Sequence, residues 1–246
     1  MNIPARKKWG QNFLIDPNIS NKIISVLGAD KNHHVLEIGP GKGALTIPLS
    51  KIVNKITAVE IDPMLCEYLE QKKINNLKIY NTDILDFDLS IMPKNYVAIG
   101  NLPYNISTPI LFKFMNKVGW NKLIVMLQRE VAERIVSSEN NKKYGRTSIM
   151  LQTFFDLKLE FHIPKTVFKP QPKITSSLLS LMPKKNININ YEDLKKIVEA
   201  AFKHRRKKLK HNLKSIINET GLKMIENNRA DQLSVIQYQE LVQYIK

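Results

Sequence analysis

The chain has 246 residues, of which 43% are hydrophobic and 24% are charged, and these values are typical of a globular protein with a sizeable core. No apolar run approaches the roughly 20 residues that span a bilayer, and the first residues are not followed by the apolar core of a signal peptide. The single cysteine excludes an internal disulfide. We therefore expect a cytoplasmic protein without a membrane segment, built from one large and one small domain.

The formal net charge is +16, and it indicates a polyanionic partner, since clustered lysine and arginine neutralise phosphates. An alternative explanation is an AT-rich coding sequence, which by itself enriches lysine, asparagine and isoleucine. The placement of the charge is therefore more informative than its sum.

Helix and strand signals alternate in chain order. Asp16-Pro17 combines an N-cap with a proline at the first helical position and predicts a helix that ends near Gly28. Asp62-Pro63 repeats this signal and predicts a helix through about Lys73. Further helical segments are expected at Ala44–Ser50, where Pro48 shortens or kinks the helix, and from Thr108-Pro109 onward. Five β-rich runs are predicted to be strands: His34–Ile38, Lys55–Ile61, Leu77–Tyr80, Tyr96–Gly100 and Leu123–Leu127.

This alternation predicts an α/β fold in which a parallel sheet is covered by helices on both faces. In such sheets ligands bind beyond the carboxyl ends of the strands. Gly39, Glu60, Asp83 and Asn101 all follow or end predicted strands, so one cleft is expected to collect them.

The sequence changes character after Pro183. The polar segment Lys184–Asn190 carries no strong element signal, and the patterns beyond it are helical, with a capped helix start at Ser234. We therefore predict two domains, residues 1–183 and 184–246.

The turn Gly39-Pro40-Gly41-Lys42-Gly43 lets the backbone approach a ligand closely. It is not a phosphate-binding P-loop, because Ala44 stands where that pattern needs glycine, and its third glycine comes one residue early for a dinucleotide fingerprint. Glu60 can accept hydrogen bonds from ribose hydroxyls, and Asp83 can accept one from an adenine amine. A tight structural turn and surface acids would explain each feature alone. Together they favour an adenosine ligand without a pyrophosphate, which S-adenosylmethionine fits.

The most specific motif is Asn101-Leu102-Pro103-Tyr104. The lone pair of an adenine N6 amine is delocalised into the ring, so two acceptors on its hydrogens, the Asn101 side-chain oxygen and the Leu102 carbonyl, would favour a pyramidal nitrogen. Pro103 makes the turn rigid, and Tyr104 offers a ring on which an extruded base can stack. Catalysis would then be mainly positioning and electrostatics.

Several segments of the chain resemble the rRNA adenine N6,N6-dimethyltransferase family, in particular its bacterial small-subunit (16S) branch. The resemblance covers nearly the whole chain and is carried by Gly10–Leu14, Leu36–Gly43, Glu60–Asp62, Asn101–Thr108, Phe168–Lys173 and Ala201–Lys207. It implies a Rossmann-like S-adenosylmethionine-dependent methyltransferase sheet with a small all-helical C-terminal domain. It also implies dimethylation of two neighbouring adenosines near the 3′ end of 16S rRNA, within the small ribosomal subunit, by a monomer that takes part in ribosome biogenesis.

The resemblance assigns roles to single residues as well. Asn12 and Leu14 would line the cofactor, Gly39 would contact its methionine portion, and Asn101 would border both cofactor and target amine. Gly41 would also bind the cofactor. Phe168 would face Tyr104 across the flipped base. Because a monomethylated amine must also be accepted, Asn101 is expected to change its hydrogen bonds between the two transfers.

Two basic runs are candidate RNA-binding segments, and they place phosphate contacts at Arg6, Lys7, Lys8, Lys203, Arg205, Arg206, Lys207 and Lys208. A merely solvated basic face is the alternative.

Three other functions stay open: a large-subunit rRNA dimethyltransferase, a non-catalytic assembly factor and a DNA adenine methyltransferase. No metal site is expected, because the five histidines and the one cysteine lack ligand-like spacing.

Overall fold

The structure is a computed structural model that describes residues 3–115 and 119–246, apart from the side chain of Lys7. The chain divides into two compact units. The first contains Met1–Ala132 and Lys158–Pro183, and the second contains Glu133–Leu157 and Lys184–Lys246. The boundary at Lys184 coincides with the predicted one. The second unit also contains Glu133–Leu157, which the sequence pattern had assigned to the first domain. The functional division into residues 1–183 and 184–246 stays a prediction.

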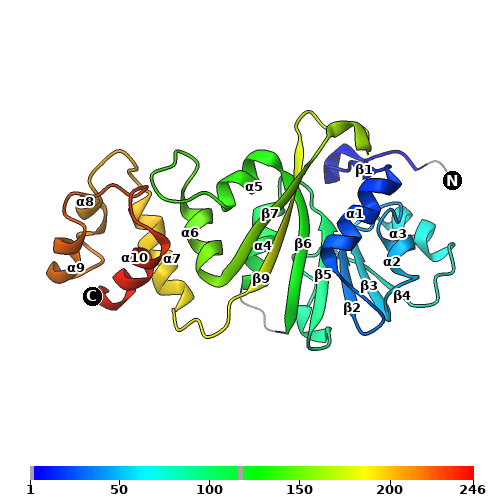
Figure 1. The fold of residues 1–246 in the computed structure, drawn as a ribbon, viewed down its shortest axis with the longest axis horizontal. Coiled ribbons are helices and arrows are strands. Elements are labelled where there is room, and N and C mark those ends of the chain that lie inside the picture. The colour runs from blue at the N-terminus through cyan, green and yellow to red at the C-terminus, as the bar shows by residue number, and fades with distance from the viewer. Residues whose placement is uncertain (1–2, 116–118) are drawn as a thin grey trace. The chain divides into compact units, whose positions relative to one another are not determined.

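The sheet has seven strands in the order β4-β3-β2-β5-β6-β9-β7 (Figure 1). Its strands are β2 (His34–Ile38), β3 (Lys55–Glu60), β4 (Leu77–Asn81), β5 (Tyr96–Asn101), β6 (Trp120–Gln128), β7 (Phe155–Ile163) and β9 (Ser176–Pro183). The five strands predicted from sequence form the parallel part, β4-β3-β2-β5-β6. Their carboxyl ends therefore meet at one edge of the sheet.

The expectation of a purely parallel sheet was incomplete, because β9 pairs antiparallel with β6 and β7 follows it at the edge. A signal for β7 is present in the sequence: from Phe155 to Ile163 apolar and polar residues alternate strictly, with the period of two that is typical of a strand. Two short strands, β1 (Phe13–Leu14) and β8 (Phe168–Lys169), form a separate antiparallel pair.

Two helices of the first unit, α1 and α3, begin where the capping signals at Asp16 and Asp62 predict, whereas α4 begins at Ser107, one residue before the expected start. Asp16 accepts hydrogen bonds from the backbone amides of Asn18 at 2.8 Å and Ile19 at 3.1 Å, and Gly28 ends the helix in the left-handed region with φ 69°. The helix expected through Lys73 ends at Glu70. The bounds are α1 (Pro17–Leu27), α2 (Thr46–Leu49), α3 (Pro63–Glu70), α4 (Ser107–Met115) and α5 (Arg129–Ile135), with single 3₁₀ turns at Lys7–Trp9, Leu89–Ile91 and Lys165–Val167. α5 continues from the first unit into the second.

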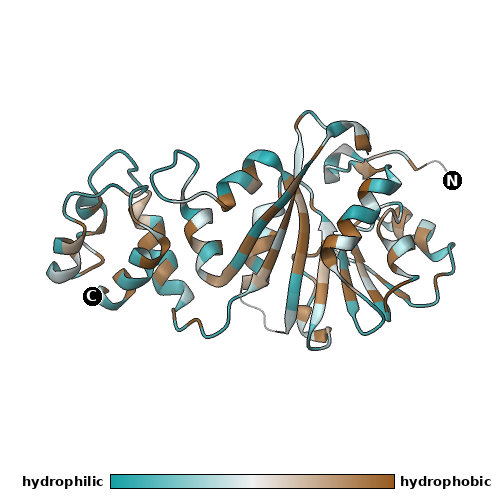
Figure 2. Ribbon diagram, viewed as in Figure 1, coloured by the Kyte–Doolittle hydropathy of each residue, from teal (hydrophilic) through white to brown (hydrophobic). Residues whose placement is uncertain are grey.

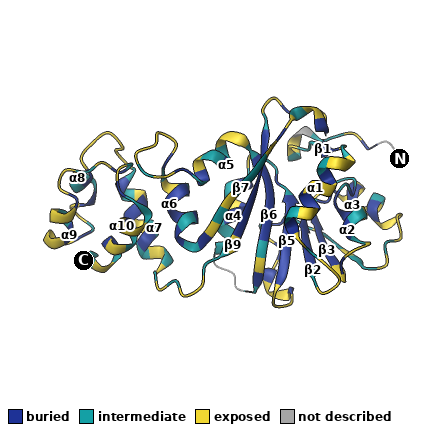
Figure 3. Cartoon of the chain, in the orientation of Figure 1, coloured by how far each residue is buried: buried dark blue, intermediate teal, exposed yellow. Residues whose placement is uncertain are grey.

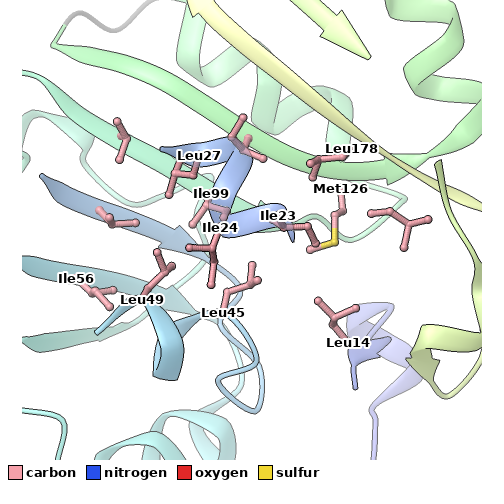
Figure 4. Packing of buried hydrophobic residues seen from close by; sticks show 14 of the residues in the cluster. Leu14, Ile23, Ile24, Leu27, Leu45, Leu49, Ile56, Ile99, Met126 and Leu178 are labelled. Carbon is pink, nitrogen blue, oxygen red and sulfur yellow. The ribbon is translucent and has the colours of Figure 1, made fainter. Parts of the chain in front are cut away.

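A cluster of buried hydrophobic side chains holds α1 and the α2 region against one face of the sheet. Ile23, Ile24 and Leu27 of α1 point toward Ile99 of β5 and Met126 of β6 (Figure 4). Figure 2 shows that the central strands carry mainly hydrophobic residues, and Figure 3 shows that these strands are buried. Burial of this surface stabilises the sheet and fixes the strand ends that carry polar residues.

The second unit is mainly helical. Its helices are α6 (Arg146–Phe154), α7 (Tyr191–Ala201), α8 (Leu209–Leu213), α9 (Glu219–Met224) and α10 (Val235–Leu241), followed by a 3₁₀ turn at Val242–Tyr244. α7 packs against α6, α8 and α10. The ring of Tyr238 stacks on Phe202 at a centroid distance of 6.3 Å, and its hydroxyl donates to the Ala230 carbonyl at 2.7 Å. Ser234 caps α10 as the sequence predicts. In the described part of the chain, every helix is too short or too polar to cross a bilayer.

Candidate active site

One cavity lies at the carboxyl ends of the parallel strands, and most of the predicted site residues line it. These are Asn12, Leu14, Gly39, Gly41, Glu60, Asp83, Asn101, Leu102, Pro103 and Tyr104. They come from separate parts of the sequence and meet because β2, β3 and β5 are parallel neighbours. Phe168 is not among the residues that line the cavity.

Glu60 is the last residue of β3, and only 5% of its surface is exposed. Its Oε2 atom accepts the Gly41 backbone N–H at 3.1 Å, and its Oε1 atom accepts the Asp62 N–H at 3.0 Å. Gly41 has φ 56°, a left-handed conformation that glycine adopts without steric cost. Each carboxylate oxygen has a second lone pair, so the fixed group can still accept from a pair of vicinal hydroxyls. Burial raises the pKa of Glu60 above its ordinary value.

Asp83 follows β4 and lies beside Ile84 in the cavity wall. Its Oδ1 atom accepts the Leu85 backbone N–H at 2.8 Å, which fixes the side chain in a local turn. The other carboxylate oxygen remains to accept from a ligand amine. The role assigned to Asp83 toward adenine stays a prediction.

Glu37, to which the sequence reasoning gave no role, also lines this cavity. It is the penultimate residue of β2 and is 1% exposed. Among the described residues nothing donates a hydrogen bond to its Oε2 atom. Burial raises the pKa of Glu37 to about 8, and the nearby charge of Glu60 adds to the rise. A single acid within an otherwise apolar strand was the signal in the sequence that could have revealed it.

Two sets of contacts hold the N-terminal segment, residues 6–14, over one side of the cavity. At the first, the buried Asp62 accepts from Gln11 Nε2 at 3.0 Å and lies 3.5 Å from the Arg6 guanidinium. At the second, β1 pairs with β8, so that Leu14 is opposite Phe168. Asn12 and Leu14 are therefore held in the cavity wall by contacts far along the chain.

Asn101 ends β5 and is oriented by the same N-terminal segment. Its Nδ2 atom donates to the Asn12 carbonyl at 2.8 Å, so Oδ1 is the side-chain atom left to accept from a substrate. The Leu102 backbone N–H donates to the Met126 carbonyl of β6 at 3.2 Å. Gly100 allows this arrangement, since a Cβ there would lie 2.7 Å from the carbonyl oxygen of Ile38 in β2. The motif is thus rigidly attached to the sheet edge.

Tyr104 lines the cavity from the turn between β5 and α4, and its hydroxyl lies 2.8 Å from the Ser176 hydroxyl. Burial raises the pKa of Tyr104, which keeps the phenol neutral. Phe168 is 3% exposed and belongs to the hydrophobic cluster that includes Leu14 and Met126. A base sandwiched between Tyr104 and Phe168 therefore stays a prediction.

The basic residues predicted to contact RNA fall into two kinds. Lys8, Lys203, Arg206, Lys207 and Lys208 are exposed, and the segment from Lys203 precedes α8 as turns. Arg6 is engaged with Asp62, and both Arg6 and Lys8 lie over the ring of Trp9, at 5.0 Å and 4.0 Å. The side chain of Lys7 lies outside the described part of the structure.

Arg205 is exposed like its neighbours, but its guanidinium is also held by contacts within the second unit. Its Nη2 atom donates to the carbonyls of Lys142 at 2.8 Å and Tyr144 at 3.2 Å, and it lies 3.5 Å from Asp231. Within the second unit, these contacts connect the segment 142–144, which precedes α6, to the basic turns around Arg205. Arg205 therefore has a structural role that its sequence context did not indicate.

The Asn101 side-chain oxygen is a fixed acceptor for an amine, and it lies beside a cavity whose carboxylates can accept hydrogen bonds from a nucleoside. This combination defines the class of protein, a Rossmann-like methyltransferase that acts on an amine. Within the described residues no group of three or more histidine, cysteine, aspartate or glutamate side chains could hold a metal ion.

Comparisons with known proteins agree with that class. The family model for ribosomal RNA adenine dimethylase matches residues 2–246, so the chain belongs to this family. The ribosomal RNA small subunit methyltransferase A of Francisella tularensis subsp. novicida is 43% identical over 98% of this chain and 97% of its own length. The protein is accordingly an rRNA adenine dimethyltransferase that uses S-adenosylmethionine.

Two solved structures establish the same fold. A dimethyladenosine transferase from Plasmodium falciparum has a TM-score of 0.83 at 24% identity and covers 93% of this chain and 95% of its own. The 23S rRNA methyltransferase ErmE has a TM-score of 0.73 at 23% identity, with 94% of this chain and 98% of its own covered.

The residues of the cavity fit S-adenosylmethionine. Glu37 has a buried carboxylate oxygen without a partner that would suit a cationic part of the cofactor, and Glu60 has two fixed oxygens that would accept from its ribose. A Cβ at Gly41 would lie 3.2 Å from the Phe13 ring, which also lines the cavity, so glycine fits this tightly packed part of the wall. When bound, the cofactor supplies a methyl group that its sulfonium has already activated.

Proposed function

We propose that this enzyme transfers methyl groups to the N6 amines of two adjacent adenosines near the 3′ end of 16S rRNA, within the small ribosomal subunit. The observation that carries the proposal is the orientation of Asn101, whose Nδ2 atom is held by Asn12 while Oδ1 remains beside the cavity. The 43% identity to a small subunit methyltransferase supports the choice of RNA.

The residues of this chain contribute to catalysis by holding the target amine and its base in position. Asn101 Oδ1 accepts one hydrogen of the target amine, and the carbonyl of Leu102 accepts the other. With both hydrogens engaged, the nitrogen becomes pyramidal and its lone pair is directed at the methyl group. The Tyr104 ring supports the extruded base by stacking, which offsets part of the free energy lost on unstacking it from the RNA. No strong base is required, because the amine loses its proton only after the methyl group is attached.

The second transfer starts from an amine with a single hydrogen. The two acceptors cannot then both be engaged, so Asn101 changes its hydrogen bond between the steps. The Asn101→Ala variant tests this: a loss of both transfers supports the role in both steps, whereas loss of the first alone restricts the role to that step.

Exposed basic residues of the second unit would position the RNA by phosphate contacts, while the flipped base supplies specificity. Lys203, Arg206, Lys207 and Lys208 are exposed in the turns before α8 and suit this role. We further propose that the enzyme acts as a monomer in the cytoplasm during ribosome biogenesis.

The decisive experiment is transfer of labelled methyl groups from S-adenosylmethionine to undermethylated 30S subunits, followed by identification of the modified nucleosides. We expect N6,N6-dimethyladenosine at two adjacent positions of 16S rRNA. Free 23S rRNA and duplex DNA are the comparison substrates, and preferential methylation of either would contradict the proposal. Light scattering of the purified enzyme tests the monomer.

A further inference from the structure

A pair of hydroxyl groups connects the candidate stacking residue, Tyr104, to the first residue of β9, Ser176. The Tyr104 hydroxyl and the Ser176 Oγ atom are 2.8 Å apart, although the residues are separated by 72 positions in the sequence. Ser176 has no exposed surface, whereas Tyr104 is only half-buried and lines the cofactor cavity. The hydrogen bond thus joins a residue of the cavity wall to a buried residue behind it.

The two partners differ in how firmly the backbone holds them. Ser176 is the first residue of β9 and pairs with Gln128 at the end of β6. The neighbouring Thr175 carbonyl accepts the Arg129 backbone N–H at 2.9 Å, so the chain is fixed on both sides of the serine. Tyr104 lies in a turn, where no strand ladder sets the direction of its side chain.

A tyrosine ring has two rotatable side-chain torsions, and stacking on a base requires one particular ring plane. A hydrogen bond at the hydroxyl, the atom farthest from the backbone, restrains both torsions together. We infer that Ser176 is a positioning residue, which holds the Tyr104 ring in the plane that presents the target amine to the methyl donor. This inference rests on the proposed function, in which Tyr104 stacks on the target adenine.

The neighbouring Ser177 provides a matched control. It is equally buried, lies on the same strand, and its Oγ atom is 2.8 Å from Nδ1 of His162 in β7. Successive side chains of a strand point to opposite faces, so Ser177 faces away from Tyr104. Replacing either serine by alanine removes one buried hydroxyl from the same strand, and only one of the two changes touches the tyrosine.

The test compares Ser176→Ala, Tyr104→Phe, the double variant and Ser177→Ala in methyl transfer to undermethylated 30S subunits. Loss of one hydrogen bond is expected to lower kcat about three- to tenfold in each of the first two single variants. The double variant should be no slower than either, because both changes remove the same bond. The KM for the subunits and the cofactor affinity should stay within about twofold, since phosphate contacts and the cleft are intact. Ser177→Ala should retain the wild-type kcat.

Other outcomes would overturn the inference. If Ser176→Ala keeps the wild-type kcat, or if the losses in the double variant multiply, the hydroxyl pair does not position the ring. Equal losses in Ser176→Ala and Ser177→Ala, accompanied by equal losses of thermal stability, would show that the serine only supports the strand. Tyr104→Ala separates this inference from the proposed function: an unchanged kcat in that variant would refute stacking itself, whereas a large loss beside a normal Ser176→Ala refutes the positioning role alone.

Discussion

Replacement of Glu37 by glutamine should stabilise the cofactor-free protein at neutral and alkaline pH. The side chain is 1% exposed, and burial raises its pKa from 4.5 to about 8. An acid whose pKa is raised in the folded state contributes stability that is complete below pH 4.5 and is lost as the pH rises toward 8. The loss is about 1.4 kcal/mol per pH unit over most of this range, so it reaches roughly 3 kcal/mol at pH 7 and roughly 4 kcal/mol at pH 8, where it levels off. Glutamine cannot ionise and avoids this loss.

The same carboxylate should make cofactor binding dependent on protons. With a pKa of about 8, Glu37 is largely protonated at pH 7 in the free protein. If a cationic part of the cofactor binds beside Oε2, the acid ionises and releases nearly one proton. Glu37→Gln should bind the cofactor more weakly and release none.

Two measurements check this reasoning. Urea unfolding from pH 5 to pH 8 should show the free energies of wild type and Glu37→Gln diverging as the pH rises, while Glu70→Gln, an exposed control on α3, follows the wild type. Calorimetry in buffers of different ionisation enthalpy gives the number of protons released on binding. Parallel unfolding curves for wild type and Glu37→Gln, or equal proton release by both proteins, would refute the assigned charge state of Glu37.

Other residues give further predictions. Arg205→Ala should lower the unfolding free energy by about 1–2 kcal/mol and speed amide exchange in the segment that its guanidinium holds, because hydrogen bonds from a charged group to two backbone carbonyls are lost. Arg206→Ala should change stability by less than about 0.5 kcal/mol but reduce the salt dependence of RNA binding by about one unit of slope, and the reverse pattern would contradict both assignments. Gly100→Ala should cost about 1–3 kcal/mol in urea unfolding and weaken cofactor binding, because its Cβ would lie 2.7 Å from the Ile38 carbonyl oxygen. Ala98, two residues earlier in β5, shows that the strand itself accepts alanine, so an unchanged stability would refute the close approach.

Local signals in the sequence were sufficient for much of the fold. The caps at Asp16 and Asp62 predicted the starts of two helices, and the β-rich runs predicted the five parallel strands. Because parallel strands end at one edge, the same pattern placed Glu60 and Asn101 in one cleft. These predictions succeeded because capping and strand periodicity depend on neighbouring residues only.

Contacts between distant segments decided the rest. The sequence marks Arg205 as one basic residue in a run, yet only the folded chain brings the Lys142 and Tyr144 carbonyls to its guanidinium. It also contains Ser176 without any sign that its hydroxyl meets Tyr104.

Glu37 illustrates the physical reason most clearly. Its presence in β2 is a local fact, but its charge depends on how completely the surrounding strands and turn exclude water. Desolvation is a property of the assembled tertiary structure, so the sequence pattern by itself could bring Glu60 and Asp83 to the cleft, whereas only the fold decided that Glu37 also lines it and remains largely protonated at pH 7.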